Sequence, residues 1–236
     1  MFTDPNSPFY AAIAIGSTKV TGMVGRVDSE GVVNVLSYMA ISSTDFIRKG
    51  RVYNVDKMTQ CLKSIRERME NQLNCNIKQV YVALNCQGMR STTPLEERTF
   101  PQRITVQQEL IESLKADNRD KISQDQILID SIPLEYTMGT FSTNEAVGVM
   151  TDRIRAQFLT IICNAGAIET IESSFRKAGL PIARHTMAAD RLANVMTDEK
   201  ERSTGCVFVD KGSETTTVAV YRGKLLRHFA VLPLGG

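Results

Sequence analysis

The sequence has no tryptophan, only two histidines and no excess of charge of either sign. Nine phenylalanines and six tyrosines among 236 residues are too few for a base-stacking platform for single-stranded nucleic acid. A balance of 28 lysines and arginines against 26 aspartates and glutamates does not indicate a nucleic-acid or membrane-surface partner. No run approaches the ~18 apolar residues of a membrane-spanning helix, and residues 1–6 lack the basic and apolar regions of a signal peptide. We therefore expect a cytoplasmic chain that does not bind nucleic acid.

Motifs for metal binding or covalent catalysis are also missing. The five cysteines are odd in number and scattered without a C-x-x-C motif: Cys61, Cys75, Cys86, Cys163 and Cys206. This spacing fits neither a disulfide framework nor a zinc knuckle, so we expect small buried apolar groups in a reducing compartment. His185 and His228 are too isolated to indicate a ligand pair, and neither G-x-S-x-G nor H-E-x-x-H occurs. We therefore predict no catalytic residue.

Apolar spacing predicts a chain in which strands and helices are mixed. Apolar residues at three- and four-residue steps predict a helix over 55–74, which Asn54 can cap. A second stripe from Ile168 to Ala178 predicts a helix that stops at 179–181. Thr105 and Gln108 occupy the positions of a capping box. The remaining expected elements are helices at 106–117 and 187–197, strands at 78–84, 126–136 and 155–163, an irregular stretch at 85–104 and a linker at 198–205.

Two segments that lie 196 positions apart share one pattern. Residues 13–20 read IAIGSTKV, and residues 209–216 read VDKGSETT. In both, an apolar strand ends near a glycine, a turn rich in hydroxyl groups follows, and two further strand-like runs come next. An internal repeat on this scale predicts a duplicated α/β unit in which each copy opens with a β-hairpin.

The two turns have the chemistry of phosphate-binding loops. Glycine permits close approach to the backbone, and hydroxyl and ammonium groups add donors for phosphate oxygens. The candidate residues are Gly16, Ser17, Thr18 and Lys19 in the first turn and Asp210, Gly212, Ser213 and Thr215 in the second. Asp210 is also the candidate for Mg²⁺, since magnesium is usually held through few carboxylates and several waters. The alternative is that both glycines serve only tight hairpins.

These hairpins resemble the phosphate-1 and phosphate-2 loops of the actin, Hsp70 and sugar-kinase superfamily. More narrowly, the chain resembles the N-terminal part of the FtsA family of bacterial cell-division proteins. The resemblance is colinear through AIGSTKVTGMVG, KGRVYNVDKM, QVYVALN, SIPLEYTM, RAQFLTIIC, FRKAGL and CVFVDKGSETTTVAVYRGKLLRHFAVLPLGG. It implies an α/β chain with the actin-like, ribonuclease H-like ATPase fold.

The resemblance also implies a division into subdomains. Subdomain 1A would comprise residues 1–84 and 163–201, interrupted at 85–162 by a strand–helix–strand–strand module called 1C. Residues 203–236 would begin an incomplete subdomain 2A. The rest of 2A, all of 2B and a C-terminal membrane helix are expected beyond Gly236, so the chain is expected to be truncated.

Subdomain 1C is expected to be semi-independent of 1A. Its strands near 80–84, 126–136 and 155–163 would form a small sheet backed by the helix at 106–117. Only two chain crossings would join it to 1A.

The sequence departs from the family pattern at both turns. Ala14 and Thr217 replace acidic residues, Lys211 is unusual, and Ser213 and Glu214 replace glycines, so that Glu214 adds a carboxylate near the phosphate site. Two like charges ~4 Å apart repel by about 1 kcal/mol in water and about 4 kcal/mol at an effective dielectric constant of 20. We therefore expect weak or absent binding of ATP and Mg²⁺. At most a weak ATPase is expected, since no residue is found to position an attacking water.

The function that the resemblance implies is structural. An FtsA-like protein would bind ATP, assemble with other protomers and link the FtsZ ring to the cytoplasmic face of the membrane at the septum. It would also receive later division proteins through 1C. Two alternatives remain open: a PilM-type pilus-assembly protein, and a sugar or acid kinase of the same superfamily, for which the sequence offers no clear substrate base.

Overall fold

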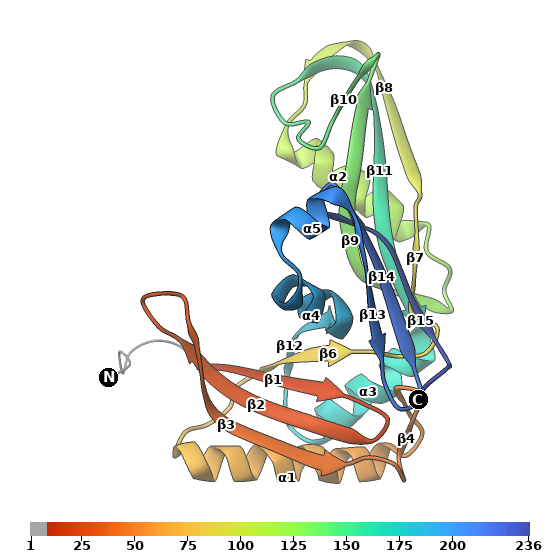
Figure 1. The fold of residues 1–236 in the computed structure, drawn as a ribbon. Coiled ribbons are helices and arrows are strands. Elements are labelled where there is room, and N and C mark those ends of the chain that lie inside the picture. Colours follow the sequence, from red (N-terminus) through yellow and green to blue (C-terminus); the bar gives the residue numbers. More distant parts are fainter. Residues whose placement is uncertain (1–8) are drawn as a thin grey trace.

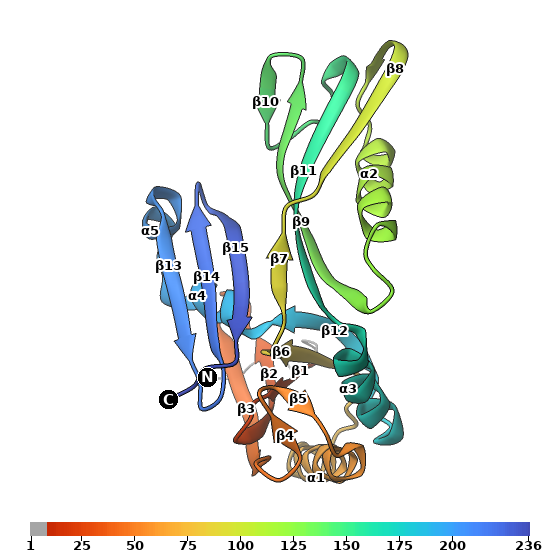
Figure 2. The same cartoon turned by 90° about the vertical axis from the view of Figure 1, so that its right-hand side faces the viewer.

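The structure is a computed structural model that describes residues 9–236. Within this range the chain forms five helices and fifteen strands, arranged in sheets of five, eight and two strands. Figures 1 and 2 show a base, built on the five-stranded sheet, from which two upright layers of strands rise.

The base is a mixed sheet with helices against it. Strands β1 (Phe9–Ile15), β2 (Lys19–Val27) and β3 (Val33–Ser42) are antiparallel, and β6 (Val80–Leu84) and β12 (Ile182–Met187) add parallel pairs in the order β12-β6-β1-β2-β3. Helices α1 (Val55–Leu73) and α3 (Ala165–Lys177) lie together under this sheet (Figure 1).

Both helices of the base form where the apolar spacing predicts them. On α1 the buried face includes Met58, Leu62, Ile65 and Met69, and the Asn54 side chain accepts a hydrogen bond from Lys57 N at 3.0 Å, as the capping prediction requires. On α3 the predicted stripe is buried, and the helix ends before Gly179, which has a φ of 64°. These two predictions are confirmed.

One upright layer has a hydrophobic core of its own. It consists of β8 (Leu95–Thr105), α2 (Gln108–Asp120), β9 (Gln126–Met138), β10 (Phe141–Thr143) and β11 (Met150–Asn164), and is called the distal unit below. Helix α2 packs on this sheet (Figure 2) and buries Ile111 and Leu114 against Ile154 and Phe158. This cluster is separate from the main core, which reaches the lower ends of β9 and β11.

The other upright layer contains the second copy of the repeat. Strands β13 (Cys206–Lys211), β14 (Thr216–Arg222) and β15 (Leu225–Leu232) are antiparallel, and β7 (Arg90–Thr92) joins β15 to β11. Helix α4 (Ala188–Met196) lies against β13 and β14, where the Tyr221 hydroxyl donates to Asp190 Oδ1 at 2.8 Å. Burial is the main cause that raises the pKa of Tyr221, and the hydrogen bond to the Asp190 carboxylate raises this pKa further.

Four expectations from the sequence are wrong. Residues 80–84 belong to the base, because β6 pairs with β1 and β12 and not with the distal unit. Residues 85–104 are not an irregular stretch, because they contain β7 and most of β8. Strand β8 lies at the edge of its sheet, and most of its polar side chains are exposed. Thr105 ends β8, and α2 begins after Gln107 without a side-chain cap. Residues 198–205 are not a linker: they form α5 (Glu199–Thr204), which Asp198 and Glu201 cap in a capping box.

Within residues 9–236, none of the helices combines the length and the apolar character that crossing a membrane requires.

The separate core of the distal unit generates a prediction about stability. Leu114→Ala is expected to lower the free energy of unfolding by about 2–5 kcal/mol, because it leaves a cavity in that cluster. Hydrogen exchange should quicken in α2 and the upper parts of β9 and β11 before it quickens in β1 and β2. The control is Glu109→Ala, an exposed change on the same helix that should cost less than about 0.5 kcal/mol. Equal acceleration throughout the chain would show that the two cores unfold as one.

Candidate phosphate-binding cleft

The two turns of the repeat have the same backbone geometry. In the first turn, residues 16–19, Gly16 N donates to Lys19 O at 3.0 Å; in the second turn, residues 212–215, Gly212 N donates to Thr215 O at 2.8 Å. A Cβ atom would lie 2.9 Å from Lys19 O at position 16 and 3.1 Å from Thr215 O at position 212. Glycine is favoured at both places because the chain closes tightly on the carbonyl group three residues later, more tightly at Gly16 than at Gly212.

Each turn leaves two backbone donors available. Among the described residues, the N–H groups of Ser17 and Thr18 have no acceptor within the chain, and those of Ser213 and Glu214 have none either. Consecutive free N–H groups in a turn form a concave surface of partial positive charge that suits an anion. The turns therefore fit phosphate oxygens through the backbone, whichever side chains they carry.

The two turns meet at one cavity. The tip of the β1–β2 hairpin lies beside the lower end of β13 (Figure 1), and the enclosed space measures about 200 Å³. Its lining comes from both turns and from the ends of β6 and α4: Ala14, Ile15, Gly16, Ser17, Thr18, Lys19, Thr21, Ala83, Asn85, Ala188, Gly212, Ser213 and Thr215. The repeat thus brings two equivalent turns to a common space.

Seven of the eight predicted site residues line this cavity, and Asp210 does not. Asp210 Oδ2 lies 3.5 Å from Asn85 Nδ2, while the hydroxyl of Thr217 donates to Asn85 Oδ1. Residues 9–236 contain no cluster of three or more acidic, histidine or cysteine side chains that could hold a metal ion. A Mg²⁺ ion in this cavity would take most of its ligands from water and phosphate oxygens, since Asp210, the predicted ligand, is not part of the lining.

A short hairpin that the sequence did not indicate connects the two turns. Strands β4 (Ile47–Arg48) and β5 (Arg51–Val52) pair around Lys49 and Gly50, whose φ values are 50° and 70°. Gly50 N donates to Ser17 Oγ at 3.0 Å, and Lys49 N donates to Glu214 Oε2 at 2.6 Å. We call residues 47–52 the connector hairpin, because its turn contacts both sides of the cleft.

The position of Glu214 differs from the one that the sequence suggested. Its carboxylate accepts a hydrogen bond from the connector hairpin, and its side chain is not among those that line the cavity. The expected repulsion between Glu214 and a bound phosphate is reduced by this orientation, because the charge interacts with a peptide N–H group outside the cavity.

Three residues of the cleft were missed at the sequence level. Asn85 follows a predicted strand directly, but its contact with Thr217 joins residues 132 positions apart. Lys49 and Gly50 lie in the basic run Arg48-Lys49-Gly50-Arg51, a composition that is more typical of a solvated loop than of a binding site. Glycine at the second position is typical of a two-residue type I′ turn, but Asn, Asp or Gly usually precedes it, so Lys49-Gly50 gives only a weak signal for the connector hairpin.

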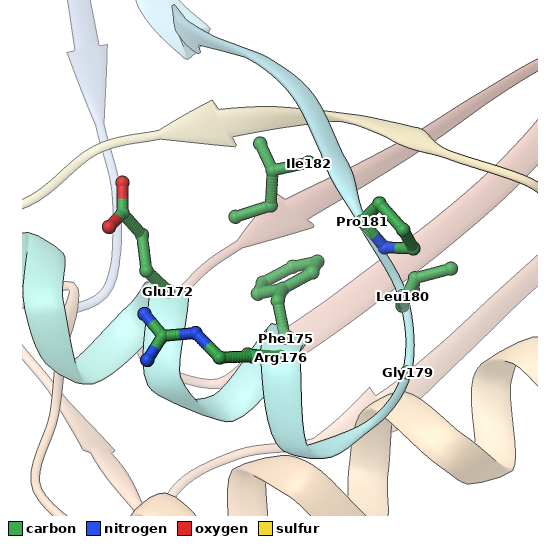
Figure 3. A pocket seen from close by; sticks show the side chains of 7 residues that line it. All are labelled: Glu172, Phe175, Arg176, Gly179, Leu180, Pro181 and Ile182. Carbon is green, nitrogen blue, oxygen red and sulfur yellow. The ribbon is translucent and has the colours of Figure 1, made fainter.

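A second cavity, of about 450 Å³, lies away from the cleft at the end of α3. It is lined by Glu172, Phe175 and Arg176 and by residues 179–182, with the Phe175 ring facing Ile182 (Figure 3). Glu172 Oε1 lies 3.8 Å from Nε2 of His185, and burial lowers the pKa of this histidine. No predicted site residue lies here.

The chain is similar to known proteins over nearly its whole length. No protein-family model matches the chain. The cell-division protein FtsA of Porphyromonas gingivalis is 28% identical over 232 residues, which cover 96% of this chain and 48% of that protein. FtsA of Escherichia coli K12 is 27% identical over 231 residues, which cover 95% of this chain and 53% of that protein. The resemblance to FtsA is confirmed.

The chain spans about half the length of the FtsA proteins that it matches. Among solved structures, a PilM–PilN type IV pilus biogenesis complex aligns over 96% of this chain and 62% of that one, with a TM-score of 0.59 and 17% identity. The ethanolamine utilization protein EutJ from Carboxydothermus hydrogenoformans aligns over 100% of this chain and 56% of its own, with a TM-score of 0.52 and 14% identity. The predicted actin-like ATPase fold is confirmed.

Substitution of the two turn glycines tests the tight closure of the turns. Gly16→Ala and Gly212→Ala should each lower the free energy of unfolding by about 1–3 kcal/mol, since the new methyl group meets a backbone carbonyl that cannot move freely. Gly166→Ala is the matched control, because Gly166 lies inside α3 and its Cβ would be 3.4 Å from Asn164 Oδ1. This substitution should be neutral or should stabilise the protein. Urea titration measures all three, and equal stability of the three variants would contradict the turn geometry.

The orientation of Glu214 generates a separate prediction. Glu214→Gln keeps an acceptor for Lys49 N but removes the charge, whereas Glu214→Ala removes both. We expect Glu214→Ala to lose about 0.5–1.5 kcal/mol of stability and Glu214→Gln to lose less. Because the carboxylate lies outside the cavity, phosphate affinity in Glu214→Gln should stay close to that of the unchanged chain. A gain of more than about fivefold, equivalent to ~1 kcal/mol, would show that Glu214 repels the anion.

Proposed function

We propose that the chain is the phosphate-binding portion of an actin-like cell-division scaffold of the FtsA type. The observation that carries this proposal is the pair of equivalent glycine turns at one cavity, in a chain similar to FtsA over nearly its whole length. In this role the protein would link the FtsZ ring to the cytoplasmic face of the membrane. It would also assemble with other copies of itself and receive later division proteins.

We assign the subdomains of such a scaffold as follows. Subdomain 1A comprises residues 1–84 and 163–201, of which residues 1–8 lie outside the described range; 1C comprises residues 85–162; and 2A begins at 203. The separate core of the distal unit supports the boundary of 1C. Support for 2A comes from the turn of β13 and β14, which faces the cleft opposite the first turn.

The cleft supports weak binding of ATP through the phosphate groups of the nucleotide. Its volume of about 200 Å³ is below the ~300–1,000 Å³ of typical small-molecule sites. The base and ribose of a nucleotide contribute most of the apolar burial, at roughly 25 cal/mol per Å², and a cavity of this volume can enclose only a small part of them. In this proposal the phosphates contact the free N–H groups of both turns and Lys19, and Asp210 orients water on any Mg²⁺ that accompanies them.

The two alternative functions have less support. Similarity to the PilM–PilN complex at 17% identity concerns the fold alone. A sugar or acid kinase needs a base near its acceptor hydroxyl, and the carboxylates nearest the cleft are both engaged: Asp210 with Asn85 and Glu214 with Lys49.

Titration calorimetry with Mg-ATP, Mg-ADP and inorganic phosphate tests the proposed binding site. We expect heats that fit dissociation constants in the millimolar range or weaker, similar for ATP and phosphate, because the contacts are to phosphate. Lys19→Ala, an exposed residue of the first turn, should weaken both, whereas Lys63→Ala, an exposed change on α1, should weaken neither. Micromolar affinity for Mg-ATP would overturn the proposed weak site.

Co-sedimentation tests the proposed scaffold role. The full-length protein that contains this chain should pellet with FtsZ filaments and stay in the supernatant without them. A PilN peptide serves as the competing ligand. Capture by PilN with no co-sedimentation with FtsZ would replace the division proposal with the pilus alternative.

A further inference from the structure

The edge of the base sheet at β3 has none of the usual protection against pairing with another strand. Strand β3 is the outermost strand of this sheet, is ten residues long and reads VNVLSYMAIS, without a charged residue or a proline. The other edge strands of the two large sheets, as far as the structure describes them, are protected. Strands β12 and β13 carry charged side chains, β8 carries charges and a proline, and β10 has three residues. A further strand can therefore join the sheet most readily at β3.

The backbone of β3 offers hydrogen-bonding groups at this edge. Ser43 N donates to Thr18 O at 3.0 Å, and the pairing between β2 and β3 continues in regular register over residues 37–42. In an antiparallel ladder the backbone groups of successive residues alternate between facing the partner strand and facing away from it. The residues whose N–H and C=O groups face away from β2 are Tyr38, Ala40 and Ser42. These groups are available to an added strand.

A groove runs beside this edge, between β3 and α1. Helix α1 lies beneath β3 (Figure 1), where Ser37 Oγ donates to Gln72 Oε1 at 2.8 Å, and the groove has a volume of about 570 Å³. On the helix its lining extends from Lys57 to Arg68. Eleven steps of an α-helix span about 16 Å, which is the length of about five residues of extended chain. The groove thus has the length of a short strand.

The side chains of the groove combine an apolar surface with one unbalanced positive charge. Ile41 and Phe46 line it on the side of the sheet. Lys57 Nζ lies 2.6 Å from Asp45 Oδ2, so these two charges balance each other at one end. Arg68, further along the helix, has no ion-pair or hydrogen-bond partner among the described residues. The groove is therefore complementary to small apolar side chains followed by a carboxylate.

We propose that the β3 edge and this groove are a docking site for an extended peptide segment of a partner protein. The segment adds a strand to β3, directs alternate side chains into the groove and places an acidic side chain beside Arg68. Hydrogen bonds between main chains supply the affinity, and the alternate side chains supply the selectivity. The inference does not depend on nucleotide binding or on a division role.

The position of α1 favours a single added strand over a second copy of this chain. Two β3 strands that paired with each other would lie about 4.8 Å apart. Each copy has α1 beneath its own β3 (Figure 1), and packed helices need about 8–10 Å between their axes. Pairing of two copies would therefore press the two α1 helices together, whereas a peptide brings no helix to this edge.

An NMR titration with two synthetic peptides tests the proposal. The probes are five residues long and blocked at both ends: valine and threonine alternate over four positions, and the fifth is aspartate in one peptide and lysine in the other. We expect amide shifts to change at residues 37–42 and 57–68, and the aspartate peptide to bind about two- to fivefold more tightly, as for an exposed ion pair. Methylation of alternate peptide nitrogens should remove binding. No binding of either peptide at millimolar concentration, or binding that survives methylation, would overturn the proposal.

Two pairs of variants locate the site. Ala40→Pro removes an outward N–H group and leaves the bonds to β2 in place, so it should weaken binding roughly tenfold, whereas Ala40→Thr keeps the N–H group and should bind normally. Arg68→Glu should reverse the preference between the two peptides, and Lys63→Glu, an exposed change on α1 outside the groove, should not.

Three results would contradict the site even if both peptides bind. Unchanged affinity in Ala40→Pro would place the peptide elsewhere, and an unchanged preference in Arg68→Glu would refute the role of Arg68. If Ala40→Pro fails to fold, as judged by circular dichroism, the methylated peptide decides on the unaltered chain. Dimerisation that rises with protein concentration and competes with the peptide would replace the partner segment with a second copy of this chain.

Discussion

The cleft depends on a close approach between Gly50 and the backbone of Asn85. A Cβ atom at position 50 would collide with the Asn85 carbonyl oxygen, and φ is positive at both Lys49 and Gly50. At position 50, only glycine avoids this collision and also adopts a positive φ without strain. The connector hairpin can therefore lie against the end of β6, where Lys49 O accepts a hydrogen bond from Gln87 N at 2.9 Å. From that position its two N–H groups reach Ser17 on one side of the cleft and Glu214 on the other.

The two sides of the cleft share one backbone arrangement although their side chains differ. Both turns use a glycine N–H group that bonds to the carbonyl three residues later, and in both the next two N–H groups have no acceptor among the described residues. An anion site made from backbone donors tolerates replacement of side chains. The hydroxyl group of Thr217 donates to Asn85 Oδ1, and Asn85 lines the cavity between the turns.

The base and the distal unit are joined by strands rather than by a flexible linker. Strand β11 runs from Met150 in the distal unit to Asn164 at the start of α3, and its buried residues enter both hydrophobic clusters. Motion of the distal unit must therefore bend β11 or disturb the short β7 pairing beside it. The two crossings lie together at this point, because β7 pairs with β11 over residues 90–92 and 160–162.

Much of the fold and of the cleft was determined by local sequence. The stripe on α1 and its Asn54 cap, the stripe on α3, and the two glycine turns each depend on residues within a few positions of one another. Periodicity and turn chemistry report such local preferences. The resemblance to FtsA rests on the order of these same segments.

Only the tertiary structure decided which segments meet. Strand β6 has the same apolar character whether it joins the base or the distal unit, and pairing with β1 and β12 selects the base. The carboxylate of Glu214 could face the cavity or the connector hairpin, and the position of Lys49, 165 residues earlier, selects the hairpin. Contacts between residues far apart in the chain depend on packing of the whole core, and no local pattern in the sequence records them.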